Sequence, residues 1–127
     1  MTTLLDASAL LASINEERGA DTVDTALSDA AMSSVNVAEV ASKLSEHGWS
    51  PKDIGPLFEQ LQLSVIPFDL STALRSGQLR QATKKLGLSL GDRACISTAM
   101  AHNMNVLTAD KTWSKLEISG LTIITLR

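Results

Sequence analysis

Two acidic residues stand where apolar stretches typical of buried strands come to an end. Asp6 directly follows the first of these stretches, and Asp110 follows another one near the end of the chain. A carboxylate at the end of a core strand loses part of its hydration, so it needs hydrogen bonds or a bound cation in compensation. Ser8 and Thr108 stand beside the two acids and can serve as hydroxyl ligands or as helix caps. These side chains indicate either a polar binding site or ordinary capping.

Two further carboxylates are predicted to open helices. Glu39 lies three residues after Asn36, a spacing that resembles a capping box, and it can also pair with Lys43 one turn further on. Asp92 can favour the positive amino end of its helix, just as Asp6 can cap the helix that follows it. Each acid therefore has a structural interpretation beside a functional one.

Asp92 fits its structural interpretation least well. At helical spacing it shares a stripe with Cys95, Ile96 and Ala99, which is predicted to be the buried face of the helix. A half-buried carboxylate costs on the order of several kcal/mol unless it is paired or bound to metal, and no partner is evident in the sequence. Acids that converge on one crevice repel one another, and a divalent cation relieves that repulsion. Oxygen ligands without His or Cys at metal spacing favour Mg²⁺ or Mn²⁺ over zinc.

Strand and helix patterns alternate along the chain. They predict strands at 2–5, 31–35, 63–66, 105–108 and 121–125, and helices at 8–17, 20–29, 37–47, from Ser50-Pro51 onward, at 71–86 and at 91–103. Strands separated by helices imply parallel pairing. The predicted fold is therefore a single α/β domain over residues 1–127, a three-layer α/β/α sandwich with a central, mostly parallel sheet. In such sheets ligands bind beyond the carboxyl ends of the strands, where the strand order reverses.

The composition is that of a globular protein, with 44% hydrophobic and 20% charged residues in 127. No apolar run approaches the roughly 18 residues of a membrane span, and no signal-peptide pattern opens the chain. The lone Cys95, expected in the core, favours a reducing compartment, so we expect a cytoplasmic protein without a membrane partner. Trp113 is expected to anchor the loop after Asp110 on the core, and Trp49 to pack beside a helix end.

Charge is unevenly distributed. The net charge of −3 argues against a general nucleic-acid-binding protein, but residues 1–60 carry −7 and residues 61–127 carry +4. Most of the positive charge comes from a basic block that comprises Arg75, Arg80, Lys84, Lys85 and Arg93. This block can be the solvated face of a helix or a patch that contacts phosphates.

Four motifs in this order, "LLDASALLA", "SSVNVAEVASKL", "LGDRACISTAMA" and "VLTADKTW", resemble the PIN-domain family over essentially the whole chain. The resemblance is greatest to the ribonuclease toxins of bacterial toxin–antitoxin systems (the VapC type). Each motif is weak alone, whereas the ordered set is fairly specific. Position by position, the family's acidic quartet matches Asp6, Glu39, Asp92 and Asp110, and its supporting polar residues match Ser8, Asn36 and Thr108.

The resemblance implies Mg²⁺- or Mn²⁺-dependent endoribonuclease activity on single-stranded or looped RNA. Asp6, Asp92 and Asp110 would hold the metal, and Glu39 would be a further ligand or would orient the attacking water. Water as nucleophile would leave a 5′-phosphate and a 3′-hydroxyl. Lys84, Lys85 and Arg93 of the basic block would contact RNA phosphates. Family members form homodimers and are inhibited by an antitoxin, so both partners are expected.

Two other classes of protein stay open on the sequence. A phosphatase of the haloacid-dehalogenase type also begins with an Asp after its first strand, but it needs a second Asp two positions on, where this chain has Ser8. A catalytically silent PIN fold that binds a partner or RNA would keep the same fold without the chemistry. Cleavage assays with and without metal separate the three.

Overall fold

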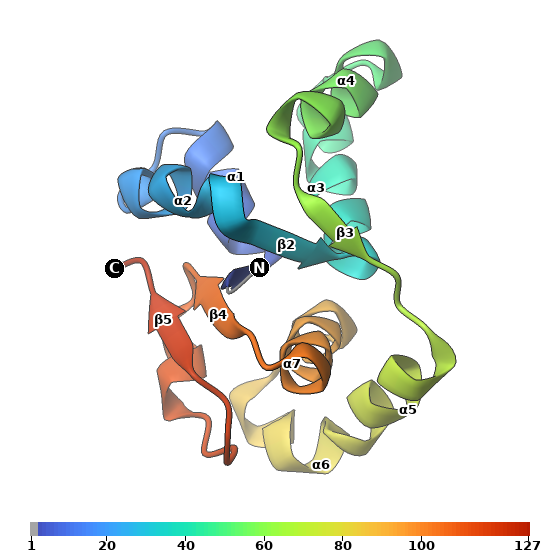
Figure 1. Cartoon of the computed structure of the whole chain (residues 1–127), viewed down its shortest axis with the longest axis vertical. Coiled ribbons are helices and arrows are strands. Elements are labelled where there is room, and N and C mark those ends of the chain that lie inside the picture. Colours follow the sequence, from blue (N-terminus) through green and yellow to red (C-terminus); the bar gives the residue numbers. More distant parts are fainter. Residues whose placement is uncertain (1–2) are drawn as a thin grey trace.

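The computed structural model describes residues 3–127 and contains a five-stranded sheet with the strand order β3-β2-β1-β4-β5 (Figure 1). All four pairings between neighbouring strands in this range are parallel, as the alternation of strands and helices predicts. Residue 2, the first residue of the first predicted strand, lies outside the described residues. The strands are β1 (Thr3–Leu5), β2 (Ala30–Ser33), β3 (Ser64–Ile66), β4 (Asn105–Thr108) and β5 (Ile123–Thr125).

The strand order reverses between β1 and β4. The chain proceeds from β1 outward to β2 and β3, and then returns to place β4 on the other side of β1. Leu5 is paired with Leu107 at the carboxyl ends of these two strands, and the Asp6 amide donates to the Leu107 carbonyl at 3.2 Å. The residues that follow β1 and β4 therefore meet at the position where open parallel sheets bind ligands.

The two faces of the sheet carry separate hydrophobic cores, because successive strand residues point to opposite sides. Leu4 and Val106 belong to the core that contains α7, whereas Leu5 and Leu107 belong to the core that contains α1, α2 and α3. Figure 1 shows α1 and α2 on one side of the sheet and α5, α6 and α7 on the other. The predicted three-layer sandwich is confirmed. Its main helices are α1 (Ala7–Ile14), α2 (Ala20–Ala26), α3 (Ser34–Glu46), α4 (Pro51–Leu61) and α7 (Leu90–His102).

Ser50 opens α4 as predicted, and its hydroxyl accepts the Lys52 amide. In Figure 1, α3 and α4 run beside each other and extend away from the sheet. Trp49, which follows the end of α3, is half-buried against the core on that face.

The predicted helix over 71–86 is wrong as a single element. The structure has α5 (Leu70–Gln78), α6 (Arg80–Thr83) and the 3-10 turn η2 (Lys84–Leu86) instead. The most deeply buried residues of α5 and α6 are Thr72, Ser76 and Thr83. The apolar residues Leu79 and Leu86 of this segment are partly buried against the core on the α7 side. Small hydroxyl side chains allow α5 to lie close against α7, where the oxygens of Ser76 and Ser97 are 2.6 Å apart. A tertiary contact of this kind overrides the local helical pattern.

Trp113 is fully buried in the core on the α7 side, within the short helix η3 (Lys111–Lys115). Cys95 lies in the same core and is also fully buried. Both placements agree with the sequence prediction. Within residues 3–127, no helix combines the length and the apolar character that crossing a bilayer requires.

We expect Trp113→Ala to lower the free energy of unfolding by about 3–5 kcal/mol, because it empties a large core site beneath the loop after Asp110. Trp113→Phe should cost much less, since the buried Nε1 of Trp113 has no hydrogen-bond partner to lose. Chemical denaturation measures both, with Trp49→Ala at a half-buried position as the control. Equal losses for the two Trp-to-Ala variants would contradict an anchoring role for Trp113.

Candidate functional site

A pocket of about 380 Å³ contains all four acids that the sequence singles out. These acids come from separate elements, and each is held by a different local structure. The pocket is lined by Asp6, Glu39, Asp92 and Asp110 together with Ala7, Ser8, Leu11, Ser42 and Lys43. The structure thus brings the acids together around one cavity at the β1–β4 switch point.

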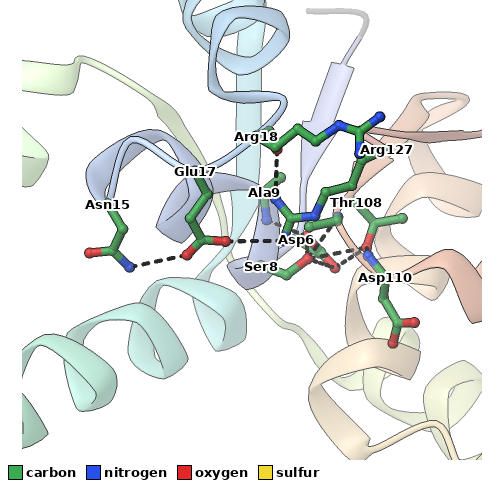
Figure 2. Close-up of polar contacts among 10 residues, drawn as sticks. Asp6, Ser8, Ala9, Asn15, Glu17, Arg18, Thr108, Asp110 and Arg127 are labelled. Carbon is green, nitrogen blue, oxygen red and sulfur yellow. Dashed lines mark hydrogen bonds and ion pairs between the residues drawn. The ribbon is translucent and has the colours of Figure 1, made fainter.

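Asp6 is the most enclosed of these acids, with 4% of its surface exposed. It is the N-cap of α1, as predicted, because its Oδ1 accepts the Ala9 amide at 2.8 Å. Two hydroxyls also donate to the carboxylate: Ser8 Oγ to Oδ1 at 2.7 Å and Thr108 Oγ1 to Oδ2 at 2.6 Å. In Figure 2 the Ser8 and Thr108 side chains converge on Asp6 from α1 and from the end of β4. The structure confirms that Asp6 caps α1, and the same carboxylate also lines the pocket.

The two hydroxyls also connect Asp6 to the loop after β4. Ser8 Oγ accepts the Ala109 amide at 2.9 Å, and Thr108 Oγ1 accepts the Asp110 amide at 3.0 Å. A chain of hydrogen bonds therefore runs from the Asp110 backbone through Thr108 to the Asp6 carboxylate. Ser8 and Thr108 orient Asp6 and fix the backbone that carries Asp110.

Burial raises the pKa of Asp6 from 3.8 to about 6. The loss of hydration outweighs the hydrogen bonds from Thr108, Ala9 and Ser8, which act to lower the pKa, and the neighbouring charge of Asp92 raises it further. The ionised form of Asp6 is thus less favoured in the protein than it is in water. A nearby cation would favour it.

Asp92 has a partner that its apolar helical stripe does not suggest. Its Oδ2 accepts the Ser89 amide at 2.9 Å, and its own amide donates to Ser89 Oγ at 3.2 Å, so the two residues form the capping box of α7. The spacing Ser89-x-x-Asp92 is the signal in the sequence that could have revealed this partner. Asp92 is half-buried, and its helical stripe of Cys95, Ile96 and Ala99 is buried as predicted.

The predicted capping box of Asn36 and Glu39 is wrong, because α3 begins earlier than expected. Ser33 is the N-cap, which places Asn36 inside the first turn. The Nδ2 of Asn36 donates to Glu39 Oε1 at 2.7 Å and to the carbonyl of Gly91 at 3.1 Å. Lys43 lies 3.6 Å from Glu46 instead of serving as a partner for Glu39. Asn36 therefore holds Glu39 at the amino end of α7, a long-range contact that no local spacing announces.

Asp110 is exposed and caps η3, since its Oδ1 accepts from the Thr112 amide at 2.9 Å and from the Thr112 hydroxyl at 2.7 Å. Figure 2 shows its carboxylate directed away from that of Asp6. Within residues 3–127, no three Asp, Glu, His or Cys side chains are close enough as placed to form a ready metal site. The chemistry of the lining still fits a hard cation, because it offers carboxylates and hydroxyls, one of them a dehydrated carboxylate.

The basic block does not form a single patch at the pocket. Lys84 and Lys85 are exposed in η2, and neither lines the pocket. Arg93 is half-buried, and its Nη1 donates to the Ser76 carbonyl at 3.1 Å, which ties α7 to α5. The base that does line the pocket is Lys43, one helical turn after Glu39. The spacing of Lys43 from Glu39 in the sequence suggests only that the two could form an ion pair. It does not reveal that Lys43 lies at the pocket.

Comparison with known families and structures agrees with the fold described above. The model of the PIN-domain family matches residues 3–118. No curated protein sequence matches the chain.

Among solved structures, similar chains occur in a toxin–antitoxin complex from Klebsiella pneumoniae (23% identity, TM-score 0.74, covering 99% of this chain and 98% of that one). A second is VapBC2 from Rickettsia felis bound to a DNA fragment from its promoter (20% identity, TM-score 0.74, 98% of each chain). A third is DNA-bound VapBC from Salmonella typhimurium (19% identity, TM-score 0.75, 100% and 99%). At these identities the structural similarity establishes the fold.

The raised pKa of Asp6 predicts a pH dependence of stability. An acid with a folded-state pKa of about 6 and an unfolded value of 3.8 contributes stability that is complete below 3.8 and is lost as the pH rises through 6. We expect the metal-free protein to lose on the order of 3 kcal/mol of unfolding free energy relative to Asp6→Asn between acidic and neutral pH. Urea denaturation across this range measures the difference.

Asp69→Asn is the control of opposite sign. Hydrogen bonds from Thr72 lower the pKa of Asp69, so its contribution to stability is lost as the pH falls. The difference in unfolding free energy between the wild type and Asp6→Asn should change with pH. If it does not, Asp6 is not held in a dehydrated state.

Proposed function

Because the chain belongs to the PIN-domain family, we propose that it is a divalent-metal-dependent endoribonuclease that hydrolyses RNA phosphodiester bonds. The observation that carries the proposal is the convergence of four acids, delivered by β1, α3, α7 and the loop after β4, on one pocket. All four stand at the positions of the family's acidic quartet. The side chains of Asp6, Glu39 and Asp92 are also constrained by hydrogen bonds to neighbouring groups, as a site that must act in one geometry requires.

Asp6, Asp92 and Asp110 are the residues that we propose to hold Mg²⁺ or Mn²⁺. When bound, such a cation lowers the pKa of water and stabilises charge that develops on a phosphate. Asp6 is kept in one orientation by Ser8 and Thr108, which donate to both of its oxygens. Asp92 is kept in place by Ser89. The Asp110 carboxylate, which is exposed and hydrogen-bonded to Thr112 of its own loop, is the ligand free to turn toward the pocket.

Glu39 is proposed to orient the attacking water and to accept its proton. Glu39 lines the pocket, and its Oε1 is fixed by Asn36. Attack of water on the phosphorus, with departure of the ribose 3′-oxygen, would leave a 5′-phosphate and a 3′-hydroxyl without a covalent enzyme intermediate. This makes the product ends a direct test of the role assigned to these residues.

RNA is proposed to reach the acidic pocket through basic residues at its edge and beyond it. Lys43 lines the pocket and is more than half exposed in its side chain (57%), so it can contact a phosphate next to the bond that is cut. Lys84 and Lys85 are exposed and can contact phosphates further along the strand. Arg93 contributes less to RNA binding in this proposal, because its guanidinium is already used between α5 and α7.

We further propose that the protein is the toxin of a toxin–antitoxin pair and that it forms a homodimer in the cytoplasm. Some of the solved structures similar to this chain are described as toxin–antitoxin complexes or systems, which supports an antitoxin partner. A pocket lined by carboxylates would also accept a basic side chain of an inhibitor near Asp6 or Asp92. The exposed apolar side chains of Val65, Leu70 and Leu74, on β3 and α5, offer a surface for a second copy.

A catalytically silent PIN fold is the alternative. The observation in its favour is that the acids, as placed among residues 3–127, do not form a group of three close enough to bind a metal. Such a protein would bind RNA or a partner without cutting RNA under any metal condition.

We expect the wild-type protein to cleave single-stranded or looped RNA only when Mg²⁺ or Mn²⁺ is present, and Asp6→Asn to cleave none. Gel analysis of end-labelled RNA, with identification of the product ends, measures both. Metal at ten times its Kd should also raise stability by about 1.4 kcal/mol, or roughly 3–6 °C in Tm. Asp92→Asn should abolish cleavage and most of this Tm shift.

Ser89→Ala is the matched control for Asp92→Asn. It removes the hydroxyl that accepts the Asp92 amide, keeps the Ser89 amide that donates to the Asp92 carboxylate, and should lower stability by about 1 kcal/mol. Because it leaves every carboxylate in place, it should keep both the Tm shift and cleavage. A wild-type Tm that is indifferent to millimolar Mg²⁺ and Mn²⁺ would argue for the silent alternative.

We expect replacement of both Lys84 and Lys85 by Ala to weaken RNA binding and to reduce its salt dependence. The slope of log K against log salt should become shallower by about 0.7 for each phosphate of single-stranded RNA that the protein no longer neutralises. The slope is obtained from RNA binding by proteins that also carry the non-cleaving Asp6→Asn substitution. Fluorescence anisotropy at several salt concentrations measures this binding. Lys52→Ala, an exposed base on α4, serves as control. If the double variant and the control have the same slope as the parent, the basic block does not bind RNA.

A further inference from the structure

Gly91, in the first turn of α7, is in direct contact with the Glu39 carboxylate of α3. Gly91 is buried, and a Cβ added to it would lie 2.5 Å from Glu39 Oε1 and closer still to Oε2 and Cδ. No other residue type has room at this position while Glu39 keeps its place. The Glu39 carboxylate occupies the volume that a side chain at position 91 would fill.

The backbone gives no reason for a glycine here. Gly91 lies within a regular helix and does not have a positive φ, unlike Gly19, Gly48, Gly87 and Gly120. Glycine is a poor helix former, so alanine would be preferred at this position on helical propensity alone. The close approach of Glu39 is the feature that requires the absence of a Cβ.

Asn36 connects the same two residues. Its Nδ2 donates to Glu39 Oε1 at 2.7 Å and to the Gly91 carbonyl at 3.1 Å, while Asn36 itself is 1% exposed. The other side-chain atom, Oδ1, is buried and has no hydrogen-bond partner. An unpartnered Oδ1 is tolerated because the reverse orientation would place it against two acceptors. Asn36 is therefore committed to holding Glu39 against the first turn of α7.

We propose that Gly91 is a positioning residue for Glu39: by lacking a side chain it admits the Glu39 carboxylate to the amino end of α7, beside Asp92. The inference rests on the nuclease function proposed above, in which Glu39 must share the pocket with Asp6 and Asp92. A side chain at position 91 displaces the carboxylate and breaks its bond to Asn36. The fold tolerates this change, because the colliding atoms are the far end of a flexible side chain.

A thermodynamic cycle tests the contact without reference to activity. Gly91→Ala should gain little or no Tm in the wild-type background, because the helix gain is offset by displacement of Glu39. In the Glu39→Ala background the same substitution should raise Tm by a few °C, roughly as helix propensity predicts for a domain of this size. Gly77→Ala is the matched control, since an added Cβ in α5 meets nothing within 4 Å. It should raise Tm equally in both backgrounds. Equal effects of Gly91→Ala in both backgrounds would overturn the proposal.

Activity supplies the second readout. Gly91→Ala should lower kcat for Mn²⁺-dependent RNA cleavage by roughly tenfold to a hundredfold, with little change in KM, because the misplaced group acts on the water and not on RNA binding. Adding Glu39→Asp to Gly91→Ala, which shortens the side chain by one methylene, should recover part of the loss. Wild-type kcat in Gly91→Ala would overturn the positioning role.

The two proposals fail in different ways. If the wild-type protein cuts no RNA, the nuclease function fails, while the Tm cycle still reports whether Gly91 admits Glu39. If the wild type cuts RNA but the cycle shows no coupling, the nuclease function stands and the positioning role of Gly91 is excluded.

Discussion

The burial of the Asp6 carboxylate at the β1–β4 switch point is the constraint on which the rest of the site depends. A dehydrated carboxylate is costly, and Asp6 is compensated by the Ala9 amide and by the hydroxyls of Ser8 and Thr108. These donors come from α1 and from β4, so compensation of one charge also joins the two central strands to the helix and to the loop that carries Asp110. The pKa of about 6 shows that compensation is incomplete. In the function proposed here, a bound cation would relieve this residual penalty.

The structural and functional interpretations of the acids are not exclusive. Asp6, Asp92 and Asp110 each cap or brace a helix start, and each also lines the same pocket. The helix starts lie at this edge of the sheet because the strands are parallel, so the carboxylates that cap them gather there. Capping fixes the orientation of Asp6 and Asp92 without enclosing the pocket. A site can thus be assembled from interactions that the fold already needs.

Glu39 reaches the pocket in a different way, because it lies within α3 and not at a helix start. Its position depends on packing between α3 and α7, where Asn36 supplies the hydrogen bond and Gly91 supplies the space. The Glu39 carboxylate of α3 can approach α7 this closely only because position 91 lacks a side chain. The geometry of Glu39 is therefore set by a pair of residues 55 positions apart, and it would respond to changes in helix packing that leave the strand ends untouched.

The sequence by itself determined the layered α/β fold and the approximate strand positions, because alternating strand and helix patterns are local signals. The ordered set of four motifs singled out the four acids, of which two follow strands and two lie in helices. The sequence also placed Trp113 and Cys95 in the core. Only the tertiary structure decided that the 71–86 segment divides into α5, α6 and η2, that Arg93 is used between α5 and α7, and that Asn36 holds Glu39 against Gly91. Each of these depends on contacts between helices distant in the chain. Local spacing records which residues share one face of an element, but not which other element that face will meet.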